Sequence, residues 1–95
     1  MIIGLDGRAR IAKDVHARRF DGELVILDLK RGDYWALDAV GARLWEALDQ
    51  GRTPRQVAAE VSPIFDVSEE QLLRDLEALT EELARRHLIV PRDSE

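Results

Sequence analysis

The sequence predicts an α+β domain, in which a three-stranded antiparallel sheet is followed by three helices. Turn residues separate short apolar runs over the first forty positions, and the apolar period then changes to that of helices. Two capping boxes divide the helical part. The chain has 95 residues, which is room for one domain over residues 1–95.

The predicted sheet is a meander of three short strands. Val15 to Phe20 leads into Asp21-Gly22, a pair that favours the positive φ angles of a type I′ hairpin turn. Glu23 to Leu29 follows as an aliphatic strand, and a turn over residues 30–33 leads into the strand from Tyr34 to Leu37. This third strand is expected to lie at the edge of the sheet.

The first two predicted helices are short. Asp38 is an N-cap for a helix from Ala39 to Leu48. The capping box Thr53-Pro54-Arg55-Gln56 opens the second helix, which is expected to stop near Ser62 because Pro63 disfavours helical geometry in the residue before it.

The third predicted helix begins at the capping box Ser68-Glu69-Glu70-Gln71 and runs to about His87. Leucines at 72, 76, 79 and 83 form one stripe, with Leu73 and Ala84 on one flank. The other flank carries Asp75, Glu82 and Arg86. We expect this helix to face both the core and a groove, residues 88–90 to pack back on the sheet, and residues 92–95 to form a tail.

Composition excludes several kinds of site. The chain has no cysteine, which excludes disulfides, thiolate metal sites and a cysteine nucleophile and favours a reducing cytoplasm. No uncharged stretch approaches the roughly 18 residues of a membrane span, and the N-terminus lacks the features of a secretory signal. His16 and His87 lie far apart without partners typical of catalysis or metal binding. We therefore predict no catalytic residue, metal or cofactor.

Charge argues against nucleic acid as the ligand. A sheet with three helices is also the content of a winged helix, which binds DNA. However, the net charge is −5, and it divides into +2 over residues 1–31 and −7 over residues 32–95. The second helix has Arg52 and Arg55 near its start but no basic stripe. A winged-helix DNA-binding regulator remains an alternative, as does a small protein that dimerises through its edge strand.

The edge strand beside a leucine-rich helix is the feature that suggests a binding site. Tyr34 and Trp35 are successive, so they point to opposite faces and cannot both enter one core. An open edge beside an apolar surface is a template on which an extended peptide adds as a strand. A buried position is the favoured interpretation for Leu37 and Leu76. The candidate peptide-binding residues are Asp33, Tyr34, Trp35, Ala36, Leu37, Leu72, Leu73, Asp75, Leu76 and Leu79.

The same residues resemble a known family. The run from Asp28 to Trp45, DLKRGDYWALDAVGARLW, the turn Gly51-Arg52-Thr53-Pro54 and the acidic leucine helix resemble the PqqD-like leader-peptide recognition proteins. The short chain resembles the separate leader-binding protein of split lasso-peptide systems. The resemblance implies a non-catalytic adaptor. Such a protein would bind the precursor's leader as a fourth strand between strand three and helix three, and present it to a leader peptidase and a cyclase.

Overall fold

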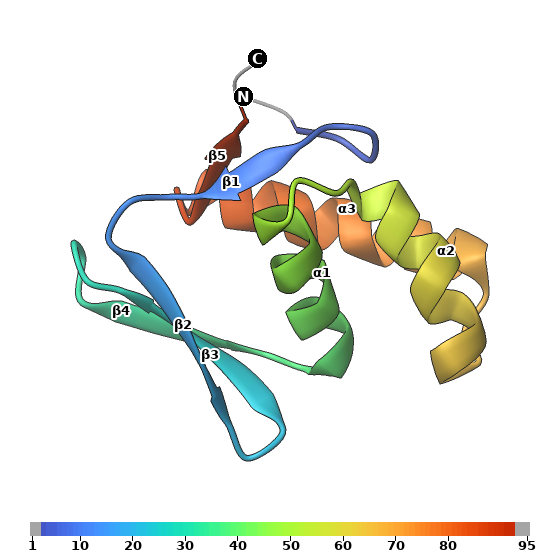
Figure 1. Ribbon diagram of the computed structural model, residues 1–95, viewed down its shortest axis with the longest axis horizontal. Coiled ribbons are helices and arrows are strands. Elements are labelled where there is room, and N and C mark those ends of the chain that lie inside the picture. The colour runs from blue at the N-terminus through green and yellow to red at the C-terminus, as the bar shows by residue number, and fades with distance from the viewer. Residues whose placement is uncertain (1–2, 93–95) are drawn as a thin grey trace.

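The computed structural model describes residues 3–92 and has the predicted α+β class, a three-stranded antiparallel sheet followed by three helices (Figure 1). The sheet contains β2 (Val15–Phe20), β3 (Glu23–Asp28) and β4 (Asp33–Leu37), in that order. The helices are α1 (Ala39–Asp49), α2 (Pro54–Phe65) and α3 (Glu69–Arg85). None of these helices is both long enough and apolar enough to cross a membrane.

Local signals in the sequence set most of these boundaries. Asp21 and Gly22 have φ angles of 54° and 85°, as the type I′ turn requires. The Asp38 carboxylate accepts the N–H of Gly41, and Thr53 and Gln56 form the predicted capping box. In α3 the cap is only half formed: Ser68 accepts the N–H of Gln71, but the Gln71 side chain bonds elsewhere on the helix.

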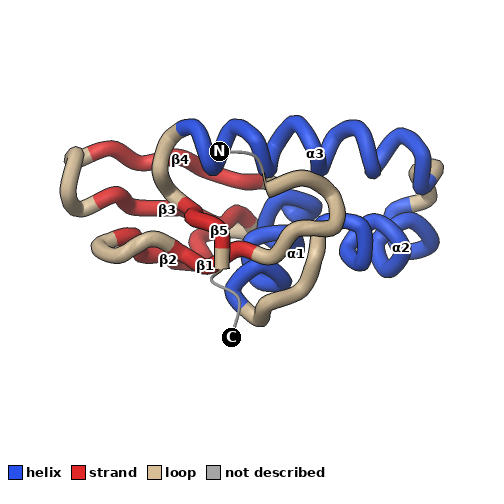
Figure 2. Tube along the Cα trace, turned by 90° about the horizontal axis from the view of Figure 1, so that it is seen from above, coloured by secondary structure: helices blue, strands red, loops and turns tan. Residues whose placement is uncertain are grey.

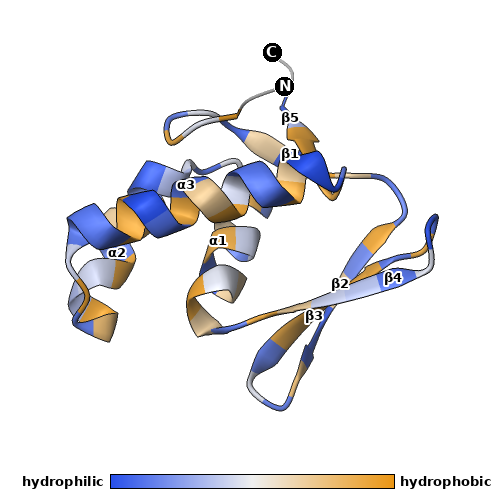
Figure 3. Cartoon of the chain, turned by 180° about the vertical axis from the view of Figure 1, so that it is seen from behind, coloured by the Kyte–Doolittle hydropathy of each residue, from blue (hydrophilic) through white to orange (hydrophobic). Residues whose placement is uncertain are grey.

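The core lies between the inner face of the sheet and the helices. Ile26 from β3, Leu44 from α1 and Leu76 from α3 are each no more than 1% exposed. Hydrophobic and hydrophilic residues alternate along α3, which is typical of a helix with one buried face (Figure 3). Leu37 is buried, as predicted.

The C-terminal apolar run pairs with a strand that the sequence analysis missed. Residues 88–90 were expected to pack back on the sheet, but β5 (Ile89–Pro91) pairs antiparallel with β1 (Ala9–Ile11) in a separate two-stranded sheet. Ala9 and Ile89 are both buried there. The pairing joins residues about 80 positions apart, which no local pattern reveals. Residues 1–2 and 93–95, including most of the predicted tail, lie outside the described part.

Two helix ends differ from prediction. The second helix was expected to stop near Ser62, but α2 continues past Pro63 to Phe65, with Asp66 in the left-handed region as its cap. Proline removes only one helical bond here, the one that its N–H would donate to the C=O of Ala59. The final turn is closed at the C=O of Ser62, which accepts the N–H groups of Asp66 and Val67. The third helix ends at Arg85 rather than near His87, whose φ angle of 61° ends helical geometry.

Candidate functional site

The outer edge of β4 carries backbone groups that pair with no other strand among residues 3–92. The N–H of Leu29 donates to the C=O of Asp14, on the β2 side of the sheet. Bonded pairs alternate along antiparallel strands, so β3 bonds β2 through residues 23, 25 and 27 and bonds β4 through residues 24, 26 and 28. Their β4 partners are residues 37, 35 and 33. The N–H and C=O groups of Tyr34 and Ala36 therefore face outward.

The two aromatic residues of β4 lie on opposite faces, as predicted. The Tyr34 side chain is 76% exposed on the outer face, whereas Trp35 is half-buried on the inner face and packs against the core. Figure 2 shows β4 as the edge of the sheet on the same side of the molecule as α3. A strand added to β4 would thus have its inward side chains between Trp35 and α3.

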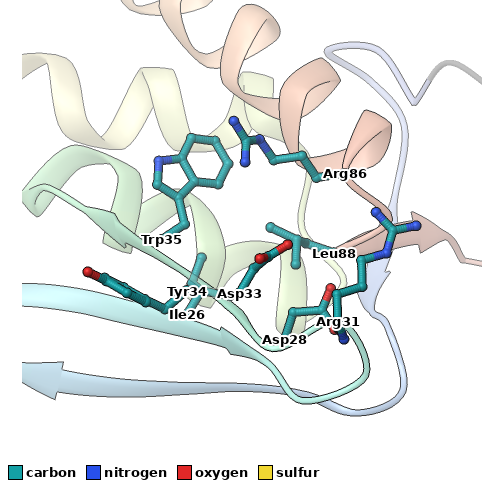
Figure 4. A pocket seen from close by; sticks show the side chains of 8 residues that line it. All are labelled: Ile26, Asp28, Arg31, Asp33, Tyr34, Trp35, Arg86 and Leu88. Carbon is teal, nitrogen blue, oxygen red and sulfur yellow. Dashed lines mark hydrogen bonds between the residues drawn. The ribbon is translucent and has the colours of Figure 1, made fainter.

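A pocket opens at the end of this edge, between the β3–β4 turn and the C-terminal end of α3 (Figure 4). Its lining residues are Ile26, Asp28, Arg31, Asp33, Tyr34, Trp35, Arg86 and Leu88. Ile26 and Leu88 are buried and give it an apolar floor, whereas Arg31, Asp33 and Arg86 are exposed at its rim. Asp28 is held within the fold, because its Oδ1 accepts the N–H groups of Lys30 and Arg31.

Arg86 closes one wall of the pocket. Its guanidinium lies over the Trp35 ring (Figure 4), with the guanidinium carbon 4.6 Å from the ring centroid, a cation–π contact. Arg86 Nε donates to Glu82 Oε2 at 2.8 Å. Glu82 also pairs with Arg85. The hydrogen bond from Arg86, together with the charges of both arginines, lowers the pKa of the Glu82 carboxyl. Glu82 therefore stays ionised and orients Arg86 over Trp35.

Gly41 sets the spacing at the other end of the groove. This buried glycine lies in the first turn of α1, and a Cβ built on it would be 3.0 Å from Leu37 Cβ and 3.4 Å from Leu79 Cδ2. The end of β4, the start of α1 and the middle of α3 therefore meet here. Leu79 is half-buried against the core at this point.

The structure brings together only part of the predicted α3 set. Leu72 and Leu76 are buried in the core, so they support the groove from below. Asp75 is exposed and accepts a bond from Gln71. Leu73 is half-buried but lies about 120° around the helix from Leu79, since six residues at about 100° each separate them. It is therefore not on the flank that carries Arg86 and faces Trp35.

On α3, Glu82 and Arg86 are the residues of this site that the sequence analysis did not select; it also did not select the pocket residues Ile26, Asp28, Arg31 and Leu88. Glu82 and Arg86 share a flank with Asp75 and Leu79, at spacings of four and three residues. That spacing was visible in the sequence, but it does not say which flank turns toward β4. Within residues 3–92, no three His, Asp or Glu side chains are grouped so as to hold a metal ion.

Comparisons with known proteins found one family model and solved structures of similar fold. The family model for coenzyme PQQ synthesis protein D (PqqD) matches residues 23–89. TbiB1, solved in complex with the TbiA(beta) leader peptide, is 30% identical with a TM-score of 0.77, over 90% of this chain and 99% of that chain. Lasso peptide synthetase B1, complexed with the leader peptide, is 26% identical with a TM-score of 0.81, over 88% of this chain and 99% of that chain. No curated protein matches the sequence.

Proposed function

Because the chain belongs to the PqqD family, we propose that it is a non-catalytic adaptor that binds the leader region of a ribosomally made precursor peptide. The leader adds antiparallel to β4 as a fourth strand, in the groove between β4 and α3. The complex presents the precursor to a leader peptidase and a cyclase of lasso-peptide-type biosynthesis in the cytoplasm.

The observation that carries this proposal is the open β4 edge beside an apolar groove. Tyr34 and Ala36 offer outward N–H and C=O groups, and Trp35 and Leu79 are half-buried on the inner side. An added strand gains affinity from the backbone bonds and selectivity from alternate side chains that enter the groove. The two similar B1 proteins were both solved with a leader peptide, which supports the same kind of ligand here.

The energetics allow a useful affinity. Two or three apolar anchors contribute about 1.5–3 kcal/mol each on burial, and each strand bond contributes about 0.5–1.5 kcal/mol net. Association itself costs roughly 4–15 kcal/mol, in addition to the ordering of a flexible peptide. Gains and cost are of similar size, so binding requires the apolar anchors as well as the strand bonds; micromolar affinity corresponds to a net of about −8 kcal/mol.

Titration of a fluorescent leader peptide into the protein, followed by anisotropy and by backbone amide shifts, tests the proposal. We expect saturable binding with little salt dependence and shifts at Tyr34 to Leu37 and along α3. Shifts confined to α2 would contradict the groove assignment. Incubation with the full precursor should leave its mass unchanged, and cleavage by the purified chain would contradict the adaptor role.

Duplex DNA distinguishes the winged-helix alternative. Because residues 32–95 carry a net charge of −7, we expect any duplex binding at physiological salt to have a dissociation constant no lower than about 10⁻⁴ M. A sequence-dependent gel shift at sub-micromolar protein, falling steeply with salt, would instead favour a DNA-binding regulator.

A further inference from the structure

The opposite edge of the same sheet, β2, is also open. The bond from Leu29 N–H to Asp14 C=O fixes the alternation, so His16 and Arg18 bond β3 and the N–H and C=O groups of Ala17 and Arg19 face outward. Within residues 3–92, no backbone hydrogen bond outside the strand ladders reaches Ala17 or Arg19. At six residues, β2 is longer than β4.

A groove runs beside this edge, between the distal half of β2 and α1. Ala17 and Arg19 line one side, Asp49 lies on the α1 side and the largely buried Trp45 is at its base. Both β2 residues are exposed, so α1 does not cover this part of the inner face. Arg19 pairs with Glu46, which holds the far end of β2 beside α1.

β2 contains no acidic residue, and its charged residues are Arg18 and Arg19. On the groove side Arg19 pairs with Glu46 and Asp49 lies nearby, so the unpaired positive charge of β2 is on its outer face. His16 and Arg18 alternate on the outer face of β2, both are exposed, and no ion pair among residues 3–92 includes Arg18. At the β4 edge the charges are mixed, since Asp33 and Glu82 are acidic and Arg31 and Arg86 are basic. Outward side chains of a strand added to β2 would lie directly across from His16 and Arg18.

We propose that the open edge of β2 is a second strand-addition site, which binds an extended segment of a partner protein carrying acidic residues at alternate positions. A second copy of β2 is a poor occupant, because β2 has no acidic residue and antiparallel pairing about Ala17 would place each Arg18 across from the other copy's His16 rather than from a carboxylate. The site is independent of the leader groove, since it uses the other edge and another helix.

The test uses the capped synthetic peptide Val-Glu-Val-Glu-Val-Glu-Val, with the lysine version Val-Lys-Val-Lys-Val-Lys-Val as the control. Titration into isotope-labelled protein should shift the amides of Ala17 and Arg19 with the acidic peptide, more weakly as salt rises. The lysine peptide should leave the amide signals of Ala17 and Arg19 unshifted. Equal response to both peptides, no response at millimolar acidic peptide, or shifts at Tyr34 and Ala36 instead would overturn the proposal.

Two alanines provide a matched pair of variants. Ala17 and Ala36 are both exposed edge-strand residues whose N–H faces outward, a position at which a strand tolerates proline. Ala17→Pro should weaken the acidic peptide about tenfold, whereas Ala36→Pro should leave it unchanged. Arg18→Glu keeps every backbone bond and should also abolish the preference for the acidic peptide. If both Ala17→Pro and Arg18→Glu bind the acidic peptide as the unmodified protein does, the proposal is overturned, whatever the outcome of the leader titration.

Discussion

The two edges of the three-stranded sheet, β4 and β2, pair with the same central strand and offer the same kind of backbone groups. Their surroundings differ. Beside β4, Trp35 and Leu79 provide half-buried apolar surface, and Arg86 closes one end. Beside β2, the inner residue Ala17 is small and exposed, and Arg18 on the outer face is basic and exposed. Backbone pairing is therefore available at both edges, and the flanking side chains decide which peptide each edge binds.

This difference has an energetic consequence. Burial of apolar anchors at β4 stabilises a complex at any ionic strength, because it removes apolar surface from water. Exposed charge pairs at β2 contribute only about 0–1 kcal/mol each and weaken with salt. We therefore expect the β4 edge to bind its peptide tightly and the β2 edge to bind weakly and reversibly.

The largest effect is expected from proline at the β4 edge. Ala36→Pro removes an outward N–H and leaves a leader carbonyl unpaired, which costs about 1–3 kcal/mol. Leader affinity should fall about 30-fold, as measured by anisotropy. Ala17→Pro should change it less than about twofold. A similar loss from both variants would show that proline acts through the sheet as a whole, and the two edges would not be separable.

Substitutions on the two flanks of α3 should differ about tenfold in their effect on leader affinity. Leu79→Gln removes apolar surface from the groove beside Leu37 and Gly41, so leader affinity should fall about tenfold. Leu73→Gln removes a similar half-buried side chain from the flank that does not face Trp35, so affinity should hold. Thermal melts of both variants control for stability. The opposite order would place the leader against Leu73, as the sequence pattern alone allowed.

Features set by neighbouring residues were predictable from the sequence. Asp21-Gly22 specifies its turn, and Asp38 and Thr53 cap their helices, because each acts within three residues along the chain. The pairing of β1 with β5 depends on contacts across nearly the whole chain, so no local pattern indicates it. Pro63 was misleading because proline disfavours a helix without always ending it.

The candidate site was predictable on the strand side and incomplete on the helix side. Alternation in β4 is fixed by geometry, so the opposite faces of Tyr34 and Trp35 followed directly. The leucine stripe showed which residues of α3 are buried, but two flanks border any stripe. The flank that faces β4 depends on how α3 rotates against Gly41 and Leu37, which is a matter of tertiary packing.

A smaller effect, about threefold, is expected from widening the groove. In Gly41→Ala the new methyl group would lie 3.0 Å from Leu37 Cβ, so β4 and α1 must shift apart slightly. Alanine favours helix by up to about 1 kcal/mol over glycine. Because this gain offsets the cost of the shift, the melting temperature should change little. Leader affinity should fall about threefold by anisotropy, while the acidic peptide at the β2 edge should bind as before. A loss at both edges would contradict a local effect.

The smallest effect concerns pH and compares Glu82 with Asp6. Hydrogen bonds from arginine lower the pKa of both carboxyls, through Arg86 for Glu82 and through Arg55 for Asp6, but only Glu82 lies beside the leader groove. Because these pKa values are lower in the folded protein, both ion pairs are fully formed above the ordinary carboxyl range and are lost as pH falls through the lowered values. Leader affinity should therefore be flat from neutral pH through the ordinary glutamate range and fall about twofold as pH drops through the lowered pKa of Glu82, when Glu82 releases Arg86 from Trp35. Glu82→Gln should remove this acid-side change in isothermal titration, whereas Asp6→Asn should retain it. If the change instead disappears in Asp6→Asn, it arises from the contact of Asp6 with α2, and Arg86 has no part in leader binding.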